Sequence, residues 1–208
     1  MAVHRWEIHR FVKLYAEKGP HDTSKRIPTL QKLYCQLDKI NEKMQPAYRY
    51  KDMWSFGSGD KTLDYQVFFL QCIYHLCACT LHSSILPVFS SSPPDPQIHK
   101  TFSRISAKQT VKHSKTLINM ATAFLAIHKN RSRLPTLIGY AMFVAATIQC
   151  KSLEAQGKLE SHSIDHLYPA VSILEELKKH WRTLQGFVCT YQNWCIYSRL
   201  ILQLVDPP

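Results

Sequence analysis

Apolar residues recur at helical spacing along most of the chain, and no stretch alternates well enough to indicate a β-strand. In residues 29–44 they lie three or four positions apart, and the run stops before Pro46. Residues 63–85 are almost continuously apolar, too long for a strand, so we expect a central buried helix there with Thr62 as its N-cap. The same spacing predicts further helices over residues 5–18, 101–128, 135–150, 164–186 and 187–204.

These elements predict an all-α fold, a bundle-like domain of about six to eight helices. Residues 1–208 are expected to form one domain with a Ser/Pro linker at 90–96, where closely spaced prolines hold the chain extended. The composition agrees with this prediction. Only 6 of 208 residues are glycine, so the glycine-dependent turns of nucleotide-binding α/β folds have little to be made from. A hydrophobic content of 45% argues against disorder.

The cysteines and the apolar stretches indicate the compartment. The 7 cysteines are an odd number and lie mostly in apolar stretches, which is typical of reduced thiols. Polar residues interrupt the N-terminal stretch, so no secretory signal peptide is predicted. Two apolar stretches, 67–89 and 134–150, contain polar residues such as Gln71 and Gln149 and are interpreted as core helices. We therefore expect a reducing compartment and no membrane association.

Cys72, His75, Cys79 and His82 look like metal ligands, because their spacing keeps them on one helical face. At about 1.5 Å per residue, however, the outer two would lie about 15 Å apart, whereas zinc needs every ligand within about 2.3 Å. Only His75 and Cys79, one turn apart, could supply half a site. Buried thiols and a hydrogen-bonded core histidine are therefore the favoured interpretation, and no metal or cofactor site is predicted.

Local catalytic motifs are also missing from the sequence. Residues 57–62 resemble a phosphate-binding loop, but Asp60 stands where glycine must precede Lys61, so the segment is interpreted as a turn that starts a helix. No HExxH motif and no GxSxG elbow occur. The sequence therefore predicts no catalytic residue and no enzyme. A nucleophilic Cys–His pair assembled in space is the open alternative.

Positive charge dominates the chain, with 26 Lys and Arg against 15 Asp and Glu and a formal net charge of +11. Five of these cations form one basic stripe within about 120° of a helical face, mainly opposite the apolar positions of 117–127. The stripe consists of Lys100, Arg104, Lys108, Lys112 and Lys115. An ordinary solvated face is the common explanation of such a pattern. The functional interpretation is an acidic partner, namely a phosphate backbone, an acidic peptide or an anionic lipid.

Four segments between residues 28 and 204 carry a family resemblance. They are Leu33…Leu37…Ile40…Pro46, Tyr74-His75…Leu81-His82, Leu134-Pro135 with residues 139–148 (GYAMFVAATI), and His166-Leu167…Ala170…Leu174…Leu177…Trp181. In this order they resemble motifs of the fungal-specific transcription factor domain, which is the regulatory region of fungal zinc-cluster activators. The weight of the resemblance comes from the four segments in sequence.

Departures from the family pattern shape what the resemblance implies. Ser83-Ser84 stand where the family has Arg-Pro, and Ile40 stands in for its usual tryptophan. The six-cysteine zinc cluster that contacts DNA in the family has no counterpart in this sequence. The resemblance therefore implies the C-terminal part of the regulatory region, as a fragment, a short gene product or a protein that lost its DNA-binding module. Zinc and DNA contact are expected only through that absent module.

The function that the resemblance implies is regulation of transcription in the nucleus, through contacts with other transcription proteins and without enzymatic activity. A small-molecule effector bound among the apolar helices and a homodimer are left open. The alternative, from charge alone, is a stand-alone basic helical protein that binds nucleic acid through the stripe.

Overall fold

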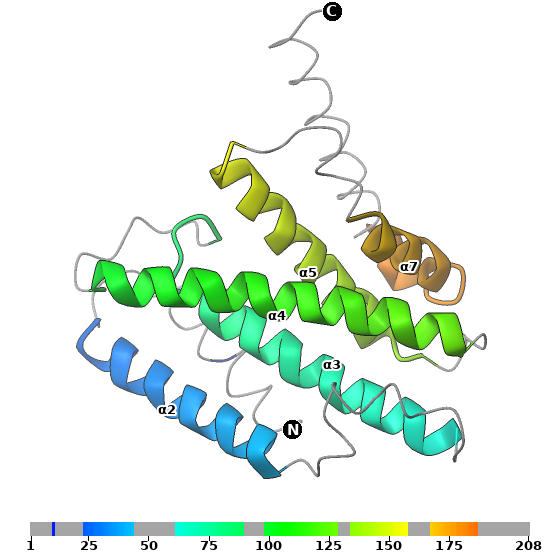
Figure 1. The fold of residues 1–208 in the computed structure, drawn as a ribbon, viewed down its shortest axis with the longest axis horizontal. Helices are drawn as coiled ribbons and strands as arrows, with labels where there is room; N and C mark the ends of the chain where they lie inside the picture. The colour runs from blue at the N-terminus through cyan, green and yellow to red at the C-terminus, as the bar shows by residue number, and fades with distance from the viewer. Residues whose placement is uncertain are drawn as a thin grey trace, which may run out of the picture. The chain divides into compact units, whose positions relative to one another are not determined.

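The computed structural model describes residue 10 and residues 23–43, 61–89, 98–128, 134–157 and 167–186. These residues are mostly helical and include no strand, which confirms the all-α class. The described elements, in chain order in Figure 1, are α2 (Thr23–Lys43), α3 (Lys61–Ser83), α4 (Lys100–Ile127), α5 (Thr136–Ala155), α7 (Tyr168–Lys178) and the 3-10 helix η5 (Arg182–Leu184). The linker at 90–96 and the helix predicted over 187–204 lie outside the described residues, as does 5–18 apart from residue 10.

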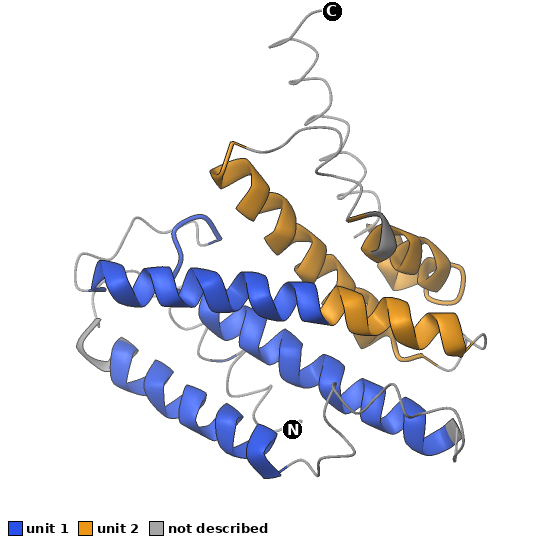
Figure 2. Ribbon diagram, in the orientation of Figure 1, with its two compact units in different colours: residues 1–116 blue, residues 117–208 orange. Residues whose placement is uncertain are grey.

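The chain divides into two compact units, Met1–Thr116 and Leu117–Pro208, coloured blue and orange in Figure 2. The division falls inside α4. Unit 1 contains α2, α3 and the first part of α4, and unit 2 contains the rest of α4 with α5, α7 and η5. That residues 1–208 form a single domain stays a prediction.

In unit 1, α2 packs against α3 through the apolar face that the sequence predicts. Leu30, Leu33 and Leu37 of this face are buried. The helix begins at Thr23 and not at 29, and Pro28 lies inside it. Proline there removes one backbone hydrogen bond, a cost that the buried leucines offset by anchoring the helix as a whole.

The central helix of unit 1 is α3, in which every residue from Gln71 to Cys79 is buried. It begins at Lys61, so Thr62 lies within the first turn and its prediction as the N-cap is wrong. It ends at Ser83 instead of 85. The hydroxyls of Ser83 and Ser84 donate hydrogen bonds to backbone carbonyls of the last turn, at 3.2 and 2.8 Å. Such bonds offer the backbone an alternative to continued helix.

Helix α4 follows its prediction to within one residue at each end, 100–127 against 101–128. His99 precedes it, and its Nδ1 accepts a hydrogen bond from the backbone N–H of Thr101 at 3.2 Å. This bond satisfies one of the N–H groups that a helix start leaves unpaired. The residues that α4 buries in unit 1 are small and hydroxylated: Ser106, Thr110 and Ser114.

In unit 2, α5 packs against α7 and η5. The single helix predicted over 164–186 is wrong, because α7 ends at Lys178 and Trp181 has an extended backbone with φ −133 and ψ 97. The indole N–H of Trp181 donates a hydrogen bond to the carbonyl of Leu134 at 2.9 Å. A tertiary contact thus interrupts the helix at a point that local spacing does not reveal.

Gly139 on α5 allows η5 to approach closely. A Cβ atom at this position would lie 2.3 Å from Cδ1 of Leu184, which is fully buried. Hydrogen fits where a methyl group does not, so the two elements meet at this glycine.

By length and composition, α5 could cross a membrane, since an 18-residue window reaches a mean hydropathy of 1.2. Half of that window is buried inside the structure, as in the core helices of soluble domains. The helix also runs to Ala155 and not to Cys150, and its added turn is polar. Lys151 and Glu154 form an ion pair there at 2.7 Å.

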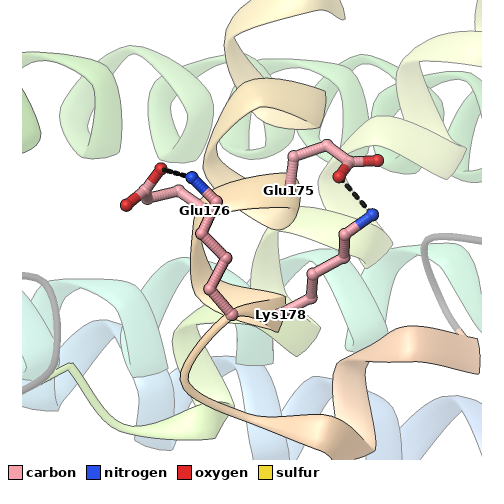
Figure 3. Close-up of polar contacts among 4 residues, drawn as sticks. Glu175, Glu176 and Lys178 are labelled. Carbon is pink, nitrogen blue, oxygen red and sulfur yellow. Dashed lines mark hydrogen bonds and ion pairs between the residues drawn. The ribbon is translucent and has the colours of Figure 1, made fainter.

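Helix α7 is amphipathic, as the sequence predicts. Ile173, Leu174 and Leu177 are buried. On its solvent side Glu175 pairs with Lys178, and Glu176 pairs with Lys179 at 2.8 Å (Figure 3). Pairs this exposed contribute about 0 to 1 kcal/mol, so the buried aliphatic face holds the helix in place.

Candidate functional sites: the basic stripe and a histidine cluster

The basic stripe lies on α4, and all five of its side chains are exposed: Lys100, Arg104, Lys108, Lys112 and Lys115. The helix has 28 residues and not one Asp or Glu among them. None of the five cations forms an ion pair with any residue that the structure describes. At about 1.5 Å per residue the stripe extends over about 22 Å. It is therefore a row of positive charges that no carboxylate of its own helix neutralises.

One apolar side chain lies beside the stripe. Ile105 is 49% exposed and follows Arg104 directly, at about 60° around the helix from Lys108. An isolated exposed isoleucine is ordinary on a protein surface. Among these cations, however, it offers a partner an apolar contact that a phosphate backbone would not use.

A second group of side chains that could take part in chemistry lies between α3 and α4 within unit 1. It consists of three imidazoles, His75 and His82 on α3 and His113 on α4, which we call the histidine cluster. Nδ1 of His75 and Nδ1 of His113 lie 2.9 Å apart. The ring of His82 stacks on that of His113, with centroids 6.0 Å apart and an interplanar angle of 18°.

Two tyrosines complete the aromatic surroundings of the cluster. Tyr34 on α2 contacts the ring of His82, with centroids 4.2 Å apart. Tyr74 makes edge contacts with His75 at 5.0 Å and with His113 at 5.8 Å. Nδ1 of His82 and the hydroxyl of Tyr34 are buried and have no hydrogen-bond partner among the described residues. All three helices of unit 1 thus meet at this cluster.

Burial makes the cluster neutral at physiological pH. It lowers the pKa of His75 to about 3, helped by His113 and Lys112. It lowers the pKa of His82 to about 3 as well, with a contribution from His113. The pKa of His113 falls to about 4, through burial and the charge of Lys112. No carboxylate among the described residues contributes to any of these shifts, so none of them would be the counter-ion of a protonated ring.

All four residues predicted to share one face of α3 are buried, and His75, Cys79 and His82 contact α4. His75 and His82 belong to the histidine cluster. The Sγ atom of Cys79 contacts the carbonyl of Thr110 at 3.9 Å. Burial raises the pKa of the Cys72 and Cys79 thiols, which opposes formation of a nucleophilic thiolate. Nδ1 of His75 pairs with Nδ1 of His113, and the absence of a metal half-site at His75 and Cys79 stays a prediction.

Neither a disulfide nor a metal-ligand group is found in the described part of the chain. None of the five cysteines described there is in a disulfide. Within the same residues no group of three His, Cys, Asp or Glu side chains could hold a metal ion. The absence of catalytic and cofactor sites stays a prediction of the sequence.

Sequence reasoning missed His113. It lies 38 residues from His75, on a helix that attracts notice for its cations. One signal could have found it, because His113 adjoins Ser114 near the side of α4 that faces away from the stripe. A histidine at the edge of a buried helical face is a candidate for pairing with another helix.

The chain matches no protein-family model, no curated protein and no solved structure in comparisons of sequence and fold.

Proposed function

We propose that the chain is an all-helical regulatory domain of a fungal transcription factor, which acts in the nucleus through contacts with other transcription proteins and catalyses no reaction. The proposal includes the finer architecture that the sequence predicts, one domain of six to eight helices with a linker at 90–96. Packing supports it, because two of the resembling segments touch. Trp181 of one donates a hydrogen bond to Leu134 of the other.

The basic stripe is the observation that supports action through contacts with other proteins. Five exposed cations on a helix without carboxylates favour a partner with regularly spaced negative charge. An acidic segment of another transcription protein fits best, because its carboxylates can meet the cations while an apolar residue covers Ile105. Charge complementarity of this kind speeds association and selects the partner more than it adds affinity.

A reporter assay tests the proposal. The chain is fused to an unrelated DNA-binding module, and the expression of a reporter gene in a fungal host is compared with that from the module alone. We expect the fusion to change expression, and the variant with all five stripe cations changed to Gln to return it to the level of the module. The control removes five positive charges elsewhere: Lys32, Lys39, Lys43, Lys151 and Lys179, each changed to Gln. An inactive fusion, or an equal loss in the control, would contradict the proposal.

The second candidate function is direct binding of nucleic acid through the same stripe. The absence of carboxylates from α4 is the observation that favours it. Titration of duplex DNA at several salt concentrations separates the two candidates. If all five cations contact phosphates, the logarithm of the binding constant falls with the logarithm of salt concentration with a slope of about −4.5. Our leading proposal expects no binding at low salt.

A small-molecule effector is the remaining part of the proposal. It is motivated by the resemblance and by the apolar helices α3 and α5. A ligand that binds only the folded chain raises the unfolding temperature. Thermal-shift measurements across pathway metabolites test this, and no shift with any of them would remove the effector while leaving the contacts with other proteins.

A further inference from the structure

The histidine cluster is not used by the proposed function, yet its geometry depends on protonation. Two ring nitrogens at 2.9 Å can form a hydrogen bond only when one carries a proton and the other accepts it. His75 and His113 therefore need exactly one proton between these two atoms. A second proton there would turn the acceptor into a donor, so that two N–H groups face each other and the newly protonated ring carries a positive charge.

His82 makes the contact of the cluster with α2 depend on protonation as well. Its ring lies between those of Tyr34 and His113, and its buried Nδ1 has no partner among the described residues. A proton added to this nitrogen would have no acceptor and would place a charge beside a neighbouring ring. Among the described residues, the other titratable or charged groups around the cluster are Tyr34 and Asp38 on α2, Tyr74 and Cys79 on α3, and Lys112 on α4. Asp38 is exposed, and the charge of Lys112 opposes protonation.

We propose that the histidine cluster is a proton-sensitive contact between α3 and α4, which holds the two helices together while its three rings are neutral and releases them as the solution turns acidic. The contact is a regulatory device because α4 carries the basic stripe. When the α3–α4 contact is lost, α3 no longer holds the helix that carries the basic stripe, on which a partner would dock.

The sign of the effect follows from proton linkage. The released state takes up protons near the ordinary histidine pKa of about 6.5, whereas the closed contact takes them up only near 3 to 4. The contact is therefore at full strength above about pH 6.5 and weakens as the pH falls toward 4. Between pH 7.5 and 5.5 each cluster histidine shifts the equilibrium toward the released state by about tenfold.

Hydrogen exchange of the full chain at pH 7.5 and 5.5, corrected for intrinsic rates, tests the proposal. We expect the amides of α3 and the first half of α4 to lose protection at pH 5.5. The double variant His82→Phe/His113→Gln should lose about a hundredfold less protection, since phenylalanine keeps the ring contacts and glutamine can donate to His75. His180→Gln, which removes an exposed histidine of unit 2, is the matched control and should behave as the unmodified chain.

Equal acid sensitivity of the double variant and the unmodified chain would overturn the proposal. Should the double variant fail to fold, NMR titration of the imidazoles in the unmodified chain decides the matter. The proposal requires the three cluster rings to stay neutral at pH 5.5 for as long as the α3–α4 contact is closed. A cluster ring that titrates near 6.5 while the amides of α3 and α4 keep their protection overturns it.

Discussion

Polar, titratable groups take part in the α3–α4 contact of unit 1, whereas aliphatic and small residues take part in the contact of α5 with α7 and η5 in unit 2. In unit 1 the contacting atoms belong to imidazoles, a thiol and a backbone carbonyl. In unit 2 they belong to buried residues such as Leu177 and Leu184, with Gly139 giving room. The stability of the first contact depends on the protonation of its histidines, and that of the second depends on the size of its side chains. Two helical contacts in one chain can therefore be perturbed independently, by pH and by side-chain size.

Leu177→Ala should break the apolar contact most strongly. Leu177 is fully buried, and truncating such a side chain costs about 2 to 5 kcal/mol, because transfer energy is lost and a cavity is left. Hydrogen exchange of the α7 amides measures the loss. The loss should be the same at pH 7.5 and pH 5.5, and a strong dependence on pH would contradict the distinction between the units.

Gly139→Ala should overpack the same contact. The new methyl group would meet Leu184, and inserting a group into a packed core costs about 1 to 3 kcal/mol, partly offset by about 1 kcal/mol from the better helix former. Thermal unfolding measures the difference. Leu184→Ala in the same chain makes room for the methyl group, so the double variant should lose less than the two single variants added together.

His82→Phe tests how much the ring nitrogen of His82 contributes to the stability of unit 1. At pH 7.5 the variant removes a buried nitrogen that has no partner among the described residues and keeps the ring contact with Tyr34, so we expect a stability change within about 1 kcal/mol of zero. Exchange of the α3 amides measures it. A loss above about 2 kcal/mol at neutral pH would mean that this nitrogen is bonded.

Glu175→Gln and Glu176→Gln should have the smallest effects, below about 0.5 kcal/mol each. Both carboxylates pair with lysines one turn away at the surface of α7. Solvent screens such pairs, and ordering the long side chains offsets much of the attraction. Thermal unfolding at low and high salt measures the change, and a larger loss would show that α7 depends on charge as well as on its apolar face.

Helical periodicity predicted most of the described fold. The bounds of α4 were predicted closely because its cations recur at helical spacing from Lys100 to Lys115 and its apolar residues continue that spacing from Leu117 to Ile127. The start of α2 was missed because Pro28 lies inside the helix, where local preference opposes it. The end of α7 was missed because the contact between Trp181 and Leu134 joins residues 47 positions apart.

The two candidate sites differ in the same way. The basic stripe lies on one helix, so spacing alone was enough to place its five side chains on the surface. The histidine cluster joins two helices and brings in a residue of a third. Spacing along α3 correctly grouped His75 with His82. The place of His113 on α4 marks it as a candidate for contact with another helix, but spacing does not identify His75 and His82 as its partners. Sites built from one element are readable in sequence, and sites built between elements depend on packing.

The lack of carboxylates on α4 also affects the helix that carries the stripe. Like charges three or four positions apart repel one another by about 0.2 to 0.5 kcal/mol per pair, and no neighbouring acid on the helix relieves this. An acidic partner would therefore remove a repulsion as well as add an attraction. Binding of a partner to the stripe should therefore stabilise α4, and a stable α4 should bind the partner more tightly. A bound partner should slow the opening of the helix that it recognises.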